Sequence, residues 1–135
     1  MNLYHVETIL AQKMLSGREL IIGLDRDPSF GPAIMFGIGG TLVEALRDVS
    51  FGVAPISRPE ASTMIRSIRA FPLLKAFRGQ PAVDLESLKS IIVHLSQLAA
   101  DCPSIAEMDL NPVIATAEGT YAVDILFQID LDKVG

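Results

Sequence analysis

The sequence predicts a single α+β domain, and three observations support this fold class. The chain has 135 residues, half of them hydrophobic, which is enough to bury one substantial core. Short apolar runs separated by turn residues occupy the first third and the last quarter of the chain. Between them lie two segments whose apolar residues recur at helical spacing. We therefore expect strands, then two helices, then strands, in one domain spanning residues 1–135.

Composition narrows the functional classes. The net charge is -5 and the basic residues are scattered, which argues against nucleic acid or an anionic membrane surface as a partner. The lone Cys102 permits no internal disulfide, and no apolar run reaches the roughly 18 to 20 residues of a membrane span. We expect a cytoplasmic protein, with the oligomeric state left open.

Four strands are predicted before the helices. Ser16 and Gly17 separate the first two, and a turn with Pro28 and Gly31 precedes the third. The runs cover residues 6–14, 19–24, 32–38 and 49–53.

Two helices follow. Ser57 and Glu60 form a capping box that begins the first helix, with Pro59 just inside it. Asp84 caps the second helix, and Cys102 with the following proline ends it.

The last segment reads as a hairpin of residues 105–115 and 121–129, with a turn around Glu118 and Gly119. Because strand side chains alternate, Glu107, Asp109 and Asn111 share one face of the first strand.

If the turn pairs Ala117 with Thr120, Asp124 joins that face beside Asn111. Asp109, Asn111 and Asp124 would then offer the hard oxygen ligands that Mg²⁺ prefers. An ordinary solvent-facing strand shows the same alternation, so the pattern alone leaves both interpretations open.

Four motifs follow one another along the chain. They are "GRELIIGLDRDPSFGPAIMFGIGGTLVEALRDV", "FPLLKAFRG", "EMDLNPV" and "AVDI". In this order they resemble the second half of the ATP-grasp region of ADP-forming acyl-CoA synthetases, which also occurs in related protein acetyltransferases. More distantly, the chain is similar to the β subunit of succinyl-CoA synthetase. The resemblance covers residues from about 9 to 129.

The resemblance implies the C-terminal lobe of an ATP-grasp fold, a mostly antiparallel sheet with two main helices packed on one face. It implies a reaction in which acyl-CoA, ADP and phosphate give the free acid, CoA and ATP through a phosphohistidine carried elsewhere. Asn111 and Asp124 match the family's Mg²⁺ ligands, and Asp109 matches the neighbouring acid.

The resemblance also implies nucleotide-binding positions for ATP or ADP. Residues 11–14, with Ala11, Gln12 and Met14, match the hinge whose backbone meets the adenine, and Glu19 matches an acid near the ribose. The segment near the phosphates matches Gly39, Gly40 and Glu44. The partners implied are the N-terminal ATP-grasp lobe and the CoA-binding domains or subunit of the same enzyme.

Two departures from the family pattern stand out. The upstream lobe, with its nucleotide-binding lysine and mobile histidine segment, is not in these residues, so this chain alone is expected to be inactive. Gly52 stands where related sequences commonly carry a basic residue that could face the phosphates. Two alternatives therefore stay open: a degenerate regulatory domain of a protein acetyltransferase, and a structural module that shares only the fold.

Overall fold

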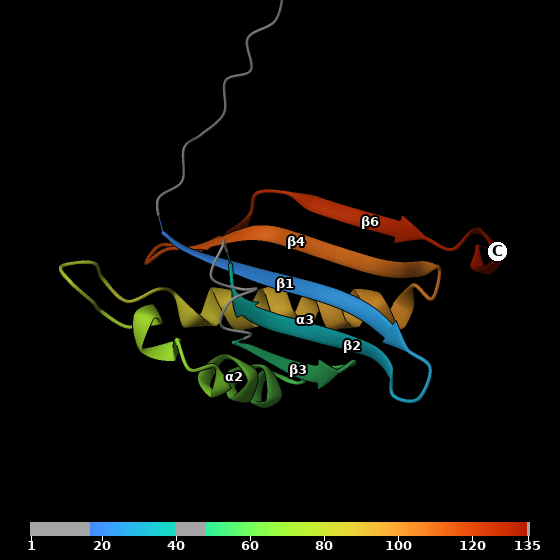
Figure 1. Ribbon diagram of the computed structural model, residues 1–135, viewed down its shortest axis with the longest axis horizontal. Coiled ribbons are helices and arrows are strands. Elements are labelled where there is room, and N and C mark those ends of the chain that lie inside the picture. The colour runs from blue at the N-terminus through green and yellow to red at the C-terminus, as the bar shows by residue number, and fades with distance from the viewer. Residues whose placement is uncertain (1–16, 40–47, 135) are drawn as a thin grey trace, which may run out of the picture.

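The computed structural model describes residues 17–39 and 48–134, which form one sheet with two helices behind it (Figure 1). The strands are β1 (Arg18–Asp27), β2 (Gly31–Ile38), β3 (Val49–Val53), β4 (Ile105–Ala115), β5 (Thr120–Ala122) and β6 (Ile125–Ile129). The helices are α2 (Arg58–Ser67) and α3 (Leu85–Asp101), with short 3₁₀ turns η1 (Phe71–Leu74) and η2 (Leu131–Lys133). None of the helices in these ranges is long and apolar enough to cross a membrane.

All strand pairs of the sheet are antiparallel, in the order β3-β2-β1-β4-β5. The long strand β4 lies beside β1 on one side, and on its other side it pairs first with β6 and then with β5. The predicted α+β class, with a mostly antiparallel sheet and both helices on one face, is confirmed.

The core lies between the sheet and the two helices. Alternate positions on β1 and β2 point toward the helices and are fully buried there, as are two positions one turn apart on α3. These residues are Leu20, Ile22, Ile34, Phe36, Leu88 and Ile92.

Both predicted helix starts are confirmed. The Ser57 hydroxyl accepts a hydrogen bond from the Glu60 backbone N–H, and the Glu60 carboxylate accepts one from the Ser57 N–H. The Asp84 carboxylate caps α3 by accepting from two backbone N–H groups. In the loop between β1 and β2, Gly31 has φ +83°, a left-handed value that favours glycine.

One half-buried polar side chain ties the helix layer to the sheet. Arg26, on β1, donates to the carbonyl oxygens of Ile105, Ala99 and Cys102 at 2.6, 2.8 and 2.9 Å. These bonds connect the end of α3 and the start of β4 to β1.

The remaining strand predictions differ in their details. The run at 19–24 is the middle of β1, while the predicted strand at 6–14 lies outside the described residues. The predicted strand 121–129 is two strands, β5 and β6, with a break at Val123 and Asp124.

The predicted pairing of Ala117 with Thr120 is wrong, because Thr120 pairs with Ala115. The reason is a longer turn. Thr116 closes it by donating its N–H to the Gly119 carbonyl at 2.8 Å, while its hydroxyl accepts from the Glu118 and Gly119 N–H groups.

Candidate functional site

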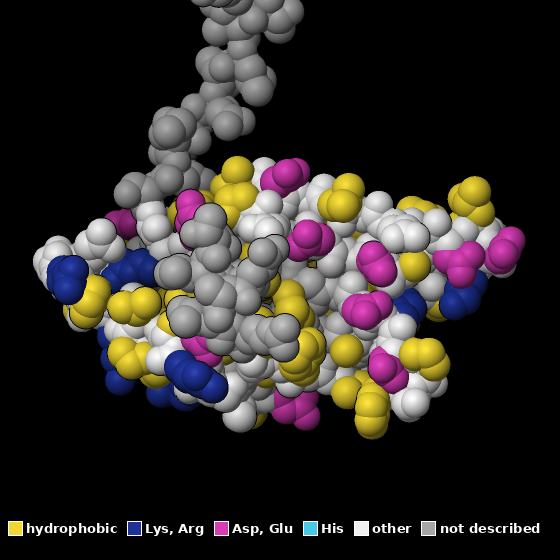
Figure 2. Space-filling view, in the orientation of Figure 1, with side chains coloured by type: hydrophobic (Ala, Val, Ile, Leu, Met, Phe, Trp, Pro, Cys, Tyr) yellow, Lys and Arg dark blue, Asp and Glu magenta, His cyan; other side chains and the backbone are white. Residues whose placement is uncertain are grey.

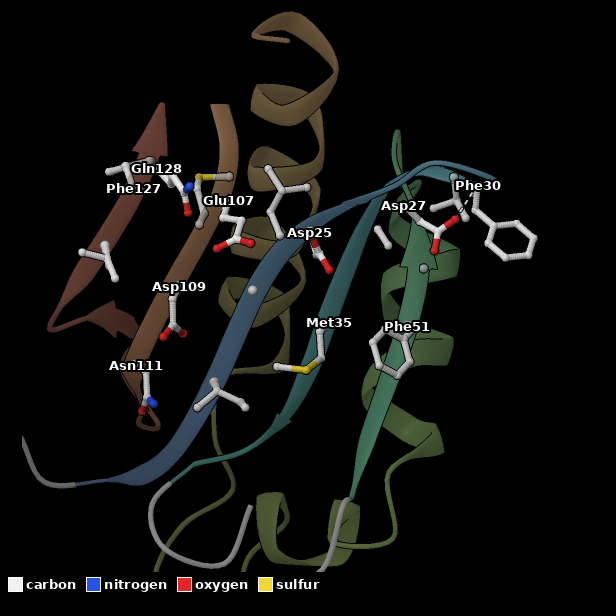
Figure 3. Close-up of a pocket in the computed structure, with 18 residues that line it drawn as sticks. Asp25, Asp27, Phe30, Met35, Phe51, Glu107, Asp109, Asn111, Phe127 and Gln128 are labelled. Atoms are coloured by element: carbon white, nitrogen blue, oxygen red, sulfur yellow. Dashed lines mark hydrogen bonds between the residues drawn. The ribbon is translucent and has the colours of Figure 1, made fainter. Parts of the chain in front are cut away.

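The face of the sheet away from the helices, which we call the open face, carries a cavity of about 930 Å³. Five strands line it, mostly with the residues that alternate with the buried ones, and Figure 3 shows Asp25, Met35 and Asp109 among the lining side chains of β1, β2 and β4. The cavity therefore follows directly from strand alternation over a sheet that, within residues 17–39 and 48–134, has helices on one side only.

Strand register arranges the open face in rows that cross the sheet. One row runs from β3 to β6 through Phe51, Met35, Gly23, Asp109 and Leu126. The next row runs through Val53, Ala33, Asp25, Glu107 and Gln128. The cavity therefore has an apolar half over β2 and β3 and an acidic half over β1 and β4.

The acidic half places like charges side by side. Asp25 lies directly opposite Glu107, and Asp109 follows two residues along β4. Within residues 17–39 and 48–134, none of these three carboxylates forms an ion pair with a basic side chain. Figure 2 looks onto this face and shows acidic side chains along it. Like charges directly opposite each other are unfavourable, so this half of the cavity favours cations.

The three predicted metal ligands lie at the lower end of β4 as drawn in Figure 3, or directly across from it. Asp109 and Asn111 line the cavity. The Asn111 N–H donates to the Asp124 carbonyl at 3.2 Å. The pairs on either side, Leu110 with Ile125 and Val113 with Ala122, continue to a position where Asp124 is opposite Asn111.

The error in the predicted register leaves this juxtaposition intact. The observed pairing differs from the predicted one by two residues, and regular alternation is interrupted here, because Asn111 lines the open face whereas Val113 is fully buried. Asp124 therefore moves from opposite Val113 to opposite Asn111. Its side chain is exposed and is not among the groups that line the cavity.

The donor set fits a hard cation. It consists of two carboxylates and one amide, and the cavity lining contains no thiol or imidazole, the ligands that zinc prefers. In the part of the chain that the structure describes, no three His, Cys, Asp or Glu side chains gather as a metal cage. A Mg²⁺ ion held by Asp109, Asn111 and Asp124 would thus complete its shell with water or phosphate oxygens.

Two of the predicted nucleotide-binding residues are described. The Gly39 N–H donates to the Glu19 carbonyl at 2.8 Å, and a Cβ at position 39 would lie 3.0 Å from the backbone of Glu19 and Leu20. Gly39 is thus required for close packing against β1. Glu19, which is exposed, and Gly39, which is buried, both line a smaller cavity of about 210 Å³. The other predicted residues, Ala11, Gln12, Met14, Gly40 and Glu44, lie outside the described residues.

In this backbone a side chain at position 52 would point toward the helices, not the open face. Gly52 is paired with the buried Ile34, so both point toward the helices. A Cβ at position 52 would lie 2.7 Å from the Met64 sulfur and 3.0 Å from an Ile56 methyl carbon. The observation that favoured a degenerate regulatory domain therefore loses its force.

Sequence reasoning missed a large part of the cavity. It interpreted residues 25–31 as turn chemistry, although β1 continues to Asp27 and carries Asp25 into the acidic half. Met35 and Phe51 lie in predicted strands, and nothing in their local sequence marks them as part of a site. The alternation of Asp25 and Asp27 with Leu24 and Arg26 was the available signal.

Comparison with known proteins gives consistent matches. Residues 2–129 match the family model described as ATP-grasp domain. The β subunit of acetate–CoA ligase [ADP-forming] I from Pyrococcus furiosus is 50% identical over 117 residues, covering 86% of this chain and 50% of that protein. The acetate–CoA ligase [ADP-forming] I of Archaeoglobus fulgidus is 47% identical over 120 residues, covering 88% of this chain and 18% of that protein.

A solved structure has the same fold. It is the dinucleotide-forming acetyl-coenzyme A synthetase 1 of Candidatus Korarchaeum cryptofilum, in complex with coenzyme A and Mg-AMPPCP. Its TM-score is 0.83 at 48% identity, over 86% of this chain and 55% of that one. This chain thus spans about half the length of the first relative and of this solved chain, and less than a fifth of the second.

Proposed function

This chain belongs to the ATP-grasp domain family, and we propose that it is the nucleotide- and Mg²⁺-binding lobe of an ADP-forming acyl-CoA synthetase. The observation that supports the proposal is that Asp109 and Asn111 line an open cavity, and that the Asn111 N–H donates to the Asp124 carbonyl on the neighbouring segment. The names of its relatives, ADP-forming acetate–CoA ligases, support the reaction class.

The charge of the open face explains why a metal would be needed. A nucleotide brings several negative charges, and the acidic half of the cavity already carries Asp25, Glu107 and Asp109. At short range these carboxylates repel phosphate oxygens. When bound, Mg²⁺ would neutralise phosphate charge and hold the phosphates near its proposed ligands, Asp109, Asn111 and Asp124.

The proposed roles of the individual side chains depend on their chemistry and their position on the sheet. Asn111 contributes an amide oxygen that needs no deprotonation, and the carboxylates of Asp109 and Asp124 supply the negative charge that holds the cation. The apolar half, with Met35 and Phe51, keeps water away from one side of a bound nucleotide.

In the proposed reaction, acyl-CoA, ADP and phosphate give the acid, CoA and ATP. The phosphohistidine that carries the phosphoryl group would come from another segment of the enzyme. We propose that the partners of this lobe are an N-terminal ATP-grasp lobe and CoA-binding domains, in the same polypeptide or in another subunit.

Calorimetric titration with ATP tests the metal site. We expect binding in the presence of Mg²⁺ and little heat when EDTA removes the metal. The double variant Asn111→Ala, Asp124→Ala should lose at least about tenfold in affinity, because it removes two of the three ligands.

The matched control is Glu118→Ala, which removes an exposed carboxylate from the β4–β5 turn, off the cavity. It should titrate like the unmodified chain, and thermal unfolding should show that all variants are folded. Equal heats for the double variant and the unmodified chain would remove the metal site. A readout independent of turnover is paramagnetic line broadening by Mn²⁺, which should concentrate at residues 109–111 and be lost in the double variant.

A further inference from the structure

A basic surface lies at the end of the molecule opposite η2. Residues 61–83 contain four basic side chains and no acidic one, although the whole chain has a net charge of -5. The four are Arg66, Arg69, Lys75 and Arg78. Figure 2 shows Lys and Arg side chains gathered at this end, while acidic side chains dominate the open face. Basic and acidic side chains of this protein are thus gathered on different surfaces.

The cations of this surface rest on aromatic rings. The Arg66 guanidinium and the Lys75 ammonium lie 5.4 and 5.1 Å from the centre of the Phe71 ring, and the Arg78 guanidinium lies 5.2 Å from that of Phe77. We call these five residues the basic turn. The ion pairs found within residues 17–39 and 48–134 involve Arg58, Lys89 and Lys133 instead. A ring orients a cation without neutralising it, so these charges stay available to a ligand.

The backbone at Arg78 is unfavourable for its residue type. Phe77 and Gln80 exchange two hydrogen bonds, at 3.0 and 2.9 Å, around a two-residue turn. Arg78 has φ +48° and Gly79 has φ +80°, so both central residues are left-handed, as in a type I′ turn. Asn, Asp and Gly tolerate this conformation at the first position, whereas a long side chain costs stability. The backbone conformation of the turn at residues 77–80 therefore does not explain why position 78 is an arginine.

The base of the basic turn is held in place. Arg18 donates from Nε to the Leu73 carbonyl at 2.9 Å and from Nη2 to the Lys75 carbonyl at 3.0 Å. Leu74 is buried, and its carbonyl accepts from the Val83 N–H at 2.9 Å. Because the supporting backbone is fixed, little conformational freedom remains to be lost on binding.

From these observations we propose that the basic turn docks on a carboxylate-bearing surface of another polypeptide. The Phe77 ring, 44% exposed, would enter an apolar depression, with Arg78 and Lys75 beside it meeting the carboxylates. A small anion fits less well, because the turn is a projecting hairpin tip and none of these three residues lines the 930 Å³ cavity. This proposal does not depend on nucleotide binding.

The probe for the test is a copolymer of glutamate and tyrosine, titrated into the full chain at low salt and followed through backbone amide NMR signals. The chain is acidic overall, so its net charge repels this anionic ligand and opposes non-specific binding. Amide shifts should concentrate at residues 66–80. Arg78→Asn should weaken binding about threefold, and Arg78→Asn with Lys75→Gln about tenfold, as expected for two exposed charges.

Three controls decide between the outcomes. Arg78→Lys should keep most of the affinity, and Arg58→Gln, which removes a cation on α2, should keep all of it. Arg78→Asn should raise the melting temperature, because asparagine tolerates the left-handed turn. A lower melting temperature would mean that Arg78 is structural, and the proposal would fall.

Equal affinities across the variants, or the absence of binding, would also overturn the proposal. Inorganic tripolyphosphate, titrated in parallel, distinguishes phosphate from carboxylate recognition. Tighter binding of tripolyphosphate at the same amides would assign the surface to a phosphate ligand instead of an acidic protein.

Discussion

The two faces of the sheet differ in what their side chains contribute, and β4 shows the difference most clearly. Met108 and Leu110 point to the helices and are buried, while Asp109 and Asn111 point to the open face and line its cavity. One strand thus supplies both core and site. Because side chains alternate, residues on one face of β4 can be substituted with little effect on the other face.

Polar groups are treated differently on the two faces. On the helix side the Asp48 carboxylate accepts from the Arg69 and Ala70 N–H groups, and the Ser96 hydroxyl accepts from the Ile56 N–H. No buried side-chain nitrogen or oxygen is left without a partner in residues 17–39 and 48–134. On the open face, the carboxylates of Asp25, Glu107 and Asp109 form no ion pair with a basic side chain of these described residues. The helix side therefore provides stability, and the open face keeps its chemistry available.

The largest expected effect comes from truncating the same residue type on each face. Phe36 on β2 is 0% exposed and faces the helices, whereas Phe51 on β3 is 67% exposed on the open face. Phe36→Ala should lower the free energy of unfolding by about 4 kcal/mol, because it leaves a cavity in the core. Phe51→Ala should change it by less than about 0.5 kcal/mol. Urea denaturation monitored by circular dichroism measures both, and similar losses would break the comparison.

The next largest effect concerns Arg26 on β1, whose side chain bonds the helix layer. Arg26→Met keeps the length of the side chain but leaves three backbone carbonyls without their charged donor, so the free energy of unfolding should fall by about 2 kcal/mol. Hydrogen exchange at the end of α3 should speed up in this variant, since Arg26 bonds the Ala99 and Cys102 carbonyls there. Unchanged exchange at these amides would show that the connection is unimportant.

The smallest effect has the opposite sign and lies on the open face. Asp25→Asn removes one of two carboxylates that face each other across β1 and β4, and should stabilise the chain by about 0.5 kcal/mol. Because salt screens exposed charges, the gain should shrink in high salt. Thermal unfolding at two salt concentrations measures it, and Glu107→Gln should give a similar gain. A loss of stability in both variants would mean that the pair is held by favourable contacts.

Local signals in the sequence predicted most elements, and their failures have a common origin. The capping box at Ser57 and the N-cap at Asp84 were readable because every partner lies within three residues. The hairpin register was not, because it is set by which residues of β4 and β5 pair across the sheet. The direction of position 52 was missed for the same reason, since it depends on pairing with Ile34, eighteen positions away.

By itself the sequence determined the order of strands and helices, the alternation of Asp109 and Asn111 with buried residues, and the family resemblance. These properties depend on neighbours in the chain, whose geometry is set by backbone periodicity. Only the tertiary structure decided that Asp25 faces Glu107, that Phe51 and Met35 complete the cavity, and that Asp124 lies opposite Asn111. Pairing between distant strands is fixed by the burial of one whole face, a collective property that no short segment encodes.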